Sequence, residues 1–512
     1  MSAWVVMPVI VPAFAAVLLL LVPRSLAVVR LIAGAATVAV LAISATFVIT
    51  LDANPIAYQV GNWPAPYGIV LVVDRLSALM LLLTSTIALL ALAHSLAGWD
   101  RRGISAASFH ALFQLELMGL NGAFLTGDVF SLFVFVEVLL LASIGLLVHG
   151  GGAERARQGL RYAVINLVGS SLLLVGVALL YGVAGTLNMA DLAVALPRLD
   201  PERARLARVA GTLLLFGFGV KAAVFPLYFW LPGSYSAAAA PVAALFAIMT
   251  KVGVYALLRI CVLVYGGMPG GSADALLWVG LCTLALGTAG VLASRDLGRF
   301  AGYLTIASVG LMLAGVGLFT PAGTSAALFY LVQSSISLAA LFLLRELVAA
   351  ERLQVADRFE PGPPLTRSSL LPALYWLLVA AAVGLPPLTG FMGKIMLLRS
   401  SAETPIAGWF WVSVLVSSLL LILAAASAGS QVFWAVRESE TRVRASRLPP
   451  ATPAAIAVAL QFVLVLAAEP LRAYTEAAAS ELHTGERYRA AVLGQRAASL
   501  DPAAGVDART SP

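Results

Sequence analysis

The sequence predicts an all-α, polytopic membrane protein with about 14 transmembrane helices. Of its 512 residues, 61% are hydrophobic and only 11% are charged, whereas a soluble domain carries about a quarter charged residues. Apolar stretches recur from residue 4 to residue 473, and each is long enough to cross a hydrocarbon core about 30 Å thick. Because lipid offers the backbone no hydrogen-bond partner, we expect these stretches to be helices.

The predicted spans share the length and apolar character of a membrane helix. The first 22 residues lack a positively charged n-region, so they are predicted to be a membrane helix and not a cleaved signal peptide. In order, the spans are residues 4–22, 28–50, 69–97, 108–126, 128–149, 161–184, 207–230, 240–265, 274–293, 300–319, 325–348, 370–398, 406–435 and 452–472.

Arginines fall on alternate connections between these spans. By the positive-inside rule the basic connections are cytoplasmic, which places the N-terminus outside. The basic connections carry Arg24 and Arg30, Arg101 and Arg102, Arg155 and Arg157, Arg295 and Arg299, Arg345 to Arg367, and Arg437 to Arg447. A cluster on the predicted outer side does not fit: Arg198, Arg203, Arg205 and Arg208. A surface amphipathic segment beginning near Asp191 is one explanation.

Composition also argues against several other classes of protein. The formal net charge is +7, but no basic stretch is interleaved with aromatic residues as a nucleic-acid groove requires. Cys261 and Cys282 form no CxxC pattern, so we expect no disulfide framework and no iron-sulfur or zinc site. The histidines show no metal-ligand spacing. We therefore expect no cofactor, no metal and no nucleic-acid partner.

Two predicted spans are interrupted by proline. Pro226 follows Lys221 by five residues, and Pro386-Pro387 interrupts the span that contains Lys394. Proline removes a backbone donor and breaks a helix. A broken helix in each half of a membrane transporter points to inverted repeats with an ion site at the break, although single proline kinks are common in membrane helices.

The lysines are the most informative residues. The chain has 32 basic side chains but only three lysines, Lys221, Lys251 and Lys394, and all three lie inside apolar spans. Arginine stays protonated in proteins, whereas a buried lysine can release its proton near neutral pH. Ionisable groups inside a membrane are usually functional. The alternative is an arginine-biased composition whose few lysines snorkel to an interface.

Glu137 is a carboxylate within the apolar span 128–149. Unpaired there, it would cost several kcal/mol. We expect it to pair with a lysine such as Lys221, because separating such a pair releases a proton. A fixed structural ion pair is the alternative. We also expect Asp74 and Arg75 to form a local structural pair, and Glu116 with Gln114 to face the bundle interior.

The same residues carry a family resemblance. They are Gly127-Asp128-Val129-Phe130 through Glu137-Val138-Leu139-Leu140, Gly159 to Gly185, Lys221 through Pro226 to Pro232, Ala240-Pro241-Val242-Ala243-Ala244, and Thr250-Lys251 to Arg259. This pattern resembles the D-type component of Mrp-type (Pha or Mnh) multisubunit monovalent cation/proton antiporters. That family is related to the proton-pumping membrane subunits of respiratory NADH dehydrogenase and membrane-bound hydrogenases.

The resemblance implies fourteen helices with two inverted five-helix repeats and broken seventh and twelfth helices. Residues 1–107 would hold helices 1–3, residues 108–266 the first repeat, residues 267–436 the second repeat, and residues 437–512 the last helix and a polar C-terminal tail. Glu137, Lys221, Lys251 and Lys394 match the family's fifth-, seventh-, eighth- and twelfth-helix sites. One departure is Gln333-Ser334-Ser335-Ile336-Ser337-Leu338, where many relatives carry a histidine and a lysine.

The function implied is proton translocation along Glu137, Lys221, Lys251 and Lys394 through waters, coupled to Na⁺ or K⁺ efflux. This would be a secondary transporter subunit and not an enzyme. The resemblance implies A-, B-, C-, E-, F- and G-type partner subunits in a bacterial inner membrane. Two alternatives stay open: a proton-pumping subunit of a redox-driven complex, and a purely structural membrane scaffold.

Overall fold

The computed structural model describes residues 2–21, 25–52, 54–98, 104–270, 274–437 and 448–494. Most of these residues are helical. The helices are α1 (Met7–Leu21), α2 (Leu26–Thr50), α3 (Arg75–Gly98), α4 (Ile104–Leu125), α5 (Val129–Val148), α6 (Ala153–Ala184), α7 (Met189–Ala195), α8 (Pro201–Ala222), α9 (Leu231–Ala237), α10 (Ala240–Leu258), α11 (Ala275–Leu292), α12 (Leu297–Val316), α13 (Pro321–Arg352), α14 (Leu370–Val383), α15 (Thr389–Ser401), α16 (Ala407–Phe433), α17 (Thr452–Leu466), α18 (Ala468–Thr484) and α19 (Glu486–Leu493).

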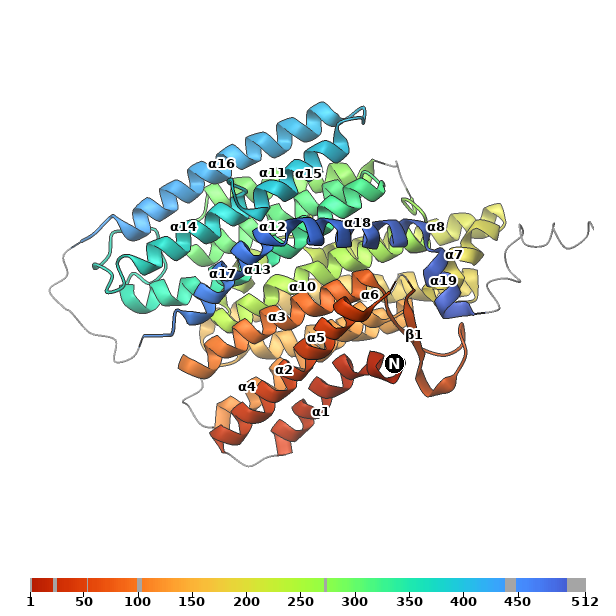
Figure 1. The fold of residues 1–512 in the computed structure, drawn as a ribbon, viewed down its shortest axis with the longest axis horizontal. Coiled ribbons are helices and arrows are strands. Elements are labelled where there is room, and N and C mark those ends of the chain that lie inside the picture. Colours follow the sequence, from red (N-terminus) through yellow and green to blue (C-terminus); the bar gives the residue numbers. More distant parts are fainter. Residues whose placement is uncertain are drawn as a thin grey trace, which may run out of the picture.

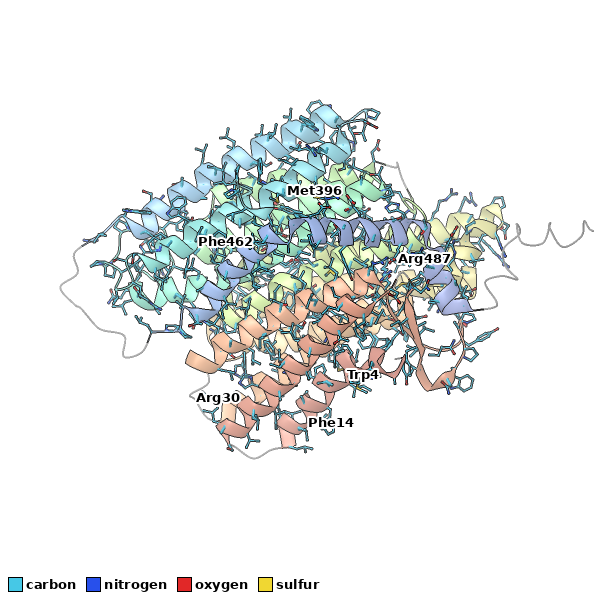
Figure 2. All side chains as sticks on the ribbon, viewed as in Figure 1. Trp4, Phe14, Arg30, Met396, Phe462 and Arg487 are labelled. Atoms are coloured by element: carbon cyan, nitrogen blue, oxygen red, sulfur yellow. The ribbon has the colours of Figure 1, made fainter. Side chains whose placement is uncertain are left out.

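The long helices pack side by side in one bundle (Figure 1), with α10 and α13 at its centre. Their apolar windows are entirely buried, whereas only 28% of the α2 window and 33% of the α16 window are buried. The outer helices expose large apolar side chains such as Phe14 and Phe462, both at the surface of the bundle (Figure 2). An apolar outer surface of this kind is what a lipid solvent requires.

Ten of the described helices are long and apolar enough to cross a membrane, or eleven if the bent pair α17–α18 is one span. Of the other three predicted spans, 108–126 coincides with α4, 207–230 with α8 and the break before α9, and 370–398 with the broken helix α14–α15. The chain is therefore a polytopic, mostly helical membrane protein. The count of fourteen crossings stays a prediction.

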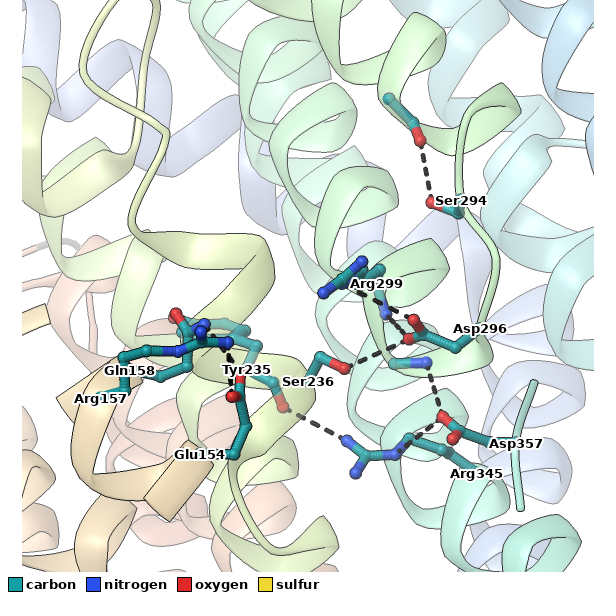
Figure 3. Close-up of polar contacts among 12 residues, drawn as sticks. Glu154, Arg157, Gln158, Tyr235, Ser236, Ser294, Asp296, Arg299, Arg345 and Asp357 are labelled. Atoms are coloured by element: carbon teal, nitrogen blue, oxygen red, sulfur yellow. Dashed lines mark hydrogen bonds and ion pairs between the residues drawn. The ribbon is translucent and has the colours of Figure 1, made fainter. Parts of the chain in front are cut away.

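Polar contacts join arginine-bearing segments at one end of the bundle, which we call the basic end: residues 153–158, 235–237, 294–299 and 345–358. Figure 3 shows polar contacts within and between these segments. Arg155 Nε donates to the Ala237 carbonyl at 3.2 Å. Arg345 Nε lies 3.2 Å from Asp357 Oδ2, and Ser236 Oγ donates to Asp296 at 3.2 Å. These connections thus share one end, as the alternation of arginines predicts. Arg24, Arg101, Arg102 and residues 438–447 lie outside the described residues.

The opposite end carries a small antiparallel hairpin, β1 (Ile56–Gln59) paired with β2 (Val70–Val73), which the all-α prediction omits. We call it the hairpin end. Gly127 N donates to the Val70 carbonyl at 2.8 Å, and Met189 N donates to the Gly127 carbonyl at 2.9 Å. The hairpin and the first turns of α5 and α7 therefore form one layer.

The C-terminal region differs from the predicted polar tail. The chain bends by 77° after α17, so that α17 ends six residues before the predicted limit of the last span. The following helices, α18 and α19, bury Thr475, Leu482, Tyr488 and Val492 against the bundle. The predicted polar tail therefore includes two helices, which hydropathy alone does not reveal because the apolar residues of α18 are spaced along one face.

The two broken helices, α8–α9 and α14–α15, run through the bundle in opposite directions. α8 starts at the hairpin end and α9 reaches the basic end, where Arg155 contacts Ala237. α14 starts at the basic end, where Arg367 pairs with Glu351. Opposite directions are what two repeats of inverted topology require, and the repeat relation itself stays a prediction.

Candidate functional site

The first candidate group lies where α8 stops. Lys221 is the penultimate residue of α8, and Ala223 then adopts a left-handed conformation with φ of 55°. The break leaves carbonyls of the last turn without helical partners. Trp230 Nε1 donates to the Val220 carbonyl of this turn at 3.1 Å, in addition to the hydrogen bond that this carbonyl accepts from Ala223 N. The negative end of the helix dipole also favours a cation at Lys221.

Glu137 on α5 and Lys221 lie together. Lys221 Nζ is 3.7 Å from Glu137 Oε1, with side chains 8% and 25% exposed. Ser170 Oγ on α6 bridges them: it accepts from Lys221 Nζ at 3.0 Å and donates to Glu137. The expected partner of Glu137 is thus present, and a hydroxyl group bridges the two charged side chains.

The residues that sequence reasoning missed form a stripe on α6. Tyr162, Asn166 and Ser170 are buried and four residues apart, so they lie on one helix face. Lys221 Nζ contacts the Asn166 carbonyl at 3.4 Å, and Tyr162 pairs with Ser143 at 2.7 Å. The sequence pattern that could have identified these residues is a row of polar side chains, four residues apart, in an otherwise apolar helix.

A small cavity adjoins Lys221, with a volume of about 10 Å³. It is lined by Tyr162, Asn166, Lys221, Trp230 and Met249, among others. That volume is close to the minimum for one water molecule, and the polar side chains of Tyr162, Asn166 and Lys221 in an otherwise largely apolar lining could supply the partners that a buried water needs. The cavity therefore lies in a position to connect Lys221 with α10.

Lys251 lies in the middle of α10 and is fully buried. Its Nζ contacts Thr250 Oγ1 at 3.4 Å, and among the described residues it has no acidic partner. Gly253 brings α10 against the end of α8, because a Cβ there would lie 2.4 Å from Ala222 N. Lys251 is two residues from Gly253 and therefore lies on the opposite face of α10, and no direct contact joins it to Lys221 in the described part of the chain.

Lys394 lies at the second break, in α15. Its Nζ donates to the Val383 carbonyl at 2.6 Å and to Ser418 Oγ at 2.7 Å. Val383 is the last residue of α14, so the lysine occupies a carbonyl that the break sets free. Both lysine-bearing breaks thus place an ammonium group at the C-terminal end of a half-helix.

Neutral polar side chains occupy residues 333–338, where the sequence departs from the family pattern. Gln333, Ser334, Ser335 and Ser337 on α13 are all buried. Gln461 Nε2 donates to the Gln333 carbonyl, and Thr389 Oγ1 donates to Gln461 Oε1, each at 3.3 Å. These contacts tie α13, α15 and α17 together near the second break through neutral side chains.

Two other expectations have different outcomes. Glu116 and Gln114 face the interior, as expected, and neither carboxylate oxygen of Glu116 has a hydrogen-bond partner among the described residues. The local Asp74–Arg75 pair was wrong. Asp74 binds Arg259 through two contacts of 2.6 and 2.7 Å, and Arg75 pairs with Glu481. The described residues include no group of three His, Cys, Asp or Glu side chains placed to hold a metal ion.

The comparisons with known proteins agree on one family. The family model described as "NADH:quinone oxidoreductase/Mrp antiporter, TM" matches residues 126–422. A relative from Rhizobium meliloti, named a probable K(+)/H(+) antiporter component of the D type, is 43% identical over 83% of this chain and 84% of its own length. A D-type Na(+)/H(+) antiporter component from Bacillus subtilis is 36% identical over 96% and 100%.

Two solved structures have the same fold. A chain of the Mrp complex from Dietzia sp. DQ12-45-1b is 28% identical, with a TM-score of 0.85, covering 96% of this chain and 100% of that one. A chain of the membrane-bound sulfane sulfur reductase, an archaeal respiratory membrane complex, is 25% identical, also with a TM-score of 0.85, covering 96% and 99%. The fold therefore occurs in both an antiporter complex and a respiratory complex.

Proposed function

Because this chain belongs to the NADH:quinone oxidoreductase/Mrp antiporter family, we propose that it is the proton-translocating D-type component of a multisubunit Na⁺ or K⁺/H⁺ antiporter. It would work in a bacterial inner membrane with A-, B-, C-, E-, F- and G-type subunits. The observation that carries the proposal is the group formed by Glu137, Ser170 and Lys221 at the end of a half-helix.

In the proposed mechanism, the ion pair holds a proton on Lys221 while Glu137 is ionised. Moving the pair apart, or neutralising Glu137, removes the charge that stabilises the ammonium group, so the proton passes on. Ser170 can accept from the lysine and donate to the carboxylate without a net change of its own protonation. One elementary charge crossing 100 mV gains about 2.3 kcal/mol, enough to bias such a pair.

The second half of the path would run from Lys251 to Lys394. Lys251 has no acidic partner among the described residues, so it gains little by keeping its proton in an apolar interior. The region between the two lysines offers the neutral side chains of Gln333 and Thr389. Proton transfer there would need waters between these groups, and inward proton flow would drive outward cation movement by the assembled complex.

The test is cation-induced collapse of a pH gradient in everted vesicles that express the whole complex. We expect Lys221→Arg to abolish the response to Na⁺ or K⁺, because arginine keeps the charge but does not release a proton. Arg472→Lys, on the exposed side of α18, is the control and should transport normally. Normal transport by Lys221→Arg would end the relay hypothesis at this site.

A redox-driven proton pump is the second candidate, and the match to a respiratory membrane complex favours it. In that complex, electron transfer in other subunits would drive the same proton path. The vesicle assay separates the two: an antiporter collapses the gradient when Na⁺ or K⁺ is added, whereas a redox pump responds to an electron donor and not to the cation. No cation response from the wild-type complex would favour the pump.

A further inference from the structure

Two of the four arginines that violate the positive-inside pattern, Arg205 and Arg208, line a groove at the start of α8. Arg205, Arg208, Thr212, Leu213, Phe216 and Met268 line this groove, which has a volume of about 660 Å³. That volume lies within the range of sites that hold small organic molecules. The groove lies at the hairpin end, between α8 and the connection that follows α10.

Its lining changes from cationic to apolar along α8. Arg205, Arg208, Thr212 and Phe216 are three or four residues apart, so they follow one face of the helix. At 1.5 Å per residue, Arg208 lies about 20 Å along the helix axis from Lys221 and Phe216 only about 8 Å. The half-thickness of the hydrocarbon core is about 15 Å. With Lys221 at the helix break in mid-membrane, the arginines reach headgroup depth and Phe216 stays among acyl chains.

The two arginines are available to a ligand. Arg203 pairs with Asp200 at 3.5 Å, but in the described part of the chain neither Arg205 nor Arg208 makes an ion pair, and both are exposed. Below them, the Phe216 side chain is 50% exposed and offers an apolar wall. Guanidinium groups bind phosphate oxygens through charge-assisted, often bidentate hydrogen bonds.

We propose that this groove binds an anionic phospholipid in the leaflet at the hairpin end, with its phosphate on Arg205 and Arg208 and an acyl chain along Leu213 and Phe216. The depth of the cationic and apolar groups favours a lipid, because both match one molecule that spans the headgroup and hydrocarbon regions. The groove is separate from the Glu137–Ser170–Lys221 group on which the proposed ion exchange depends. It also gives two of the arginines on the predicted outer side, Arg205 and Arg208, a role.

The experiment is photolabelling of the assembled complex in phosphatidylcholine vesicles that contain a trace of diazirine-bearing phosphatidylglycerol or diazirine-bearing phosphatidylcholine. Labelled residues are mapped by mass spectrometry after chymotryptic digestion. We expect phosphatidylglycerol to label residues 205–216 preferentially. The double variant Arg205→Gln/Arg208→Gln should reduce that labelling roughly tenfold or more, the effect of losing two ordinary arginine–lipid contacts.

The charge-matched control is Arg198→Gln/Arg203→Gln, which removes two arginines outside the groove and should keep the labelling. Melting temperatures of the complexes check that each variant is folded. Three results would overturn the proposal. They are equal labelling by the two lipids, an equal loss in the control, and no labelling of the groove by either lipid, which would mean that another subunit covers it.

Discussion

Asp74 and Arg259 form the most enclosed ion pair among the described residues of the hairpin end. Their side chains are 8% and 1% exposed, and the guanidinium group contacts both carboxylate oxygens. Arg259 also donates to Ser77 Oγ and lies over the rings of Tyr255 and Tyr488. Removing one member of such a pair leaves a buried charge without compensation.

Asp74→Asn should therefore destabilise the protein by about 3 kcal/mol or more, the usual cost of leaving one buried charge unpaired. Asparagine can still accept the Ser77 amide hydrogen bond that Asp74 makes at the start of α3, so the change isolates the charge. The free energy of unfolding of the detergent-solubilised protein measures this loss of stability. Glu469→Gln, in an exposed pair on α18, is the control and should leave stability unchanged. Adding Arg259→Gln to Asp74→Asn should recover part of the loss, and no recovery would contradict the ion-pair account.

At the scale of elements, the proposed proton path depends on how tightly the broken helix α8 packs against the continuous helix α10. α10 approaches the end of α8 at Gly253, where a Cβ would lie 2.4 Å from Ala222 N and 2.7 Å from its Cα. Backbone atoms cannot move aside as a flexible side chain can. Only glycine permits this approach, which brings the α10 face that carries Met249 and Val252 against the break after Lys221.

Gly253→Ala should push α10 away from the end of α8 and cost about 1–3 kcal/mol of stability, as overpacking usually does. It should also slow cation-dependent proton transport, because the water-sized cavity beside Lys221 is lined by residues of both helices. The control is Gly182→Ala on α6, where a Cβ meets nothing within 4 Å. We expect Gly182→Ala to be neutral or slightly stabilising, since alanine favours a helix. Equal melting temperatures and transport rates for the two variants would contradict this packing argument.

The apolar spans and the lysines within them could be predicted from sequence because each depends on local composition. The partner of Asp74 could not, since Arg259 lies 185 residues away along the chain. Ser170 was missed because a serine in an apolar helix usually bonds its own backbone. The bend into α18 was missed because length and hydropathy do not report the direction of a helix.

At the scale of the whole molecule, α18 and α19 cover the hairpin end. There the C-terminal part of the chain contacts both α3 and α13. Arg75 at the start of α3 pairs with Glu481, and Tyr474 donates to the Arg75 carbonyl at 3.1 Å. On the other side, α18 contacts the first turns of α13: Ser325 meets Thr475 at 3.2 Å. The C-terminal helices therefore hold α3 and α13 together over the start of α5.

This closure should weaken in mild acid through His483. Its Nε2 lies 3.0 Å from Thr324 Oγ1 on α13, and burial lowers the pKa of His483 below its ordinary value of 6.5. A lowered pKa means that the folded state favours the neutral ring. The stabilisation is therefore complete above about pH 6.5 and is lost as pH falls through the folded-state pKa. Burial raises the pKa of nearby Glu481, against the opposing effect of Arg75, so protonation of that carboxyl on acidification favours the folded form and does not explain a loss.

We expect the backbone amides of α18 to exchange with solvent faster at pH 5.5 than at pH 7.5, after correction for intrinsic rates, because acidification protonates a ring that the folded state holds neutral. His483→Gln keeps a side chain that can bond Thr324 but does not titrate, so it should remove most of this difference. The amides of α10, buried at the centre of the bundle, are the internal control. If the wild type and His483→Gln responded equally to pH, the acid sensitivity of the closure would have to come from another group.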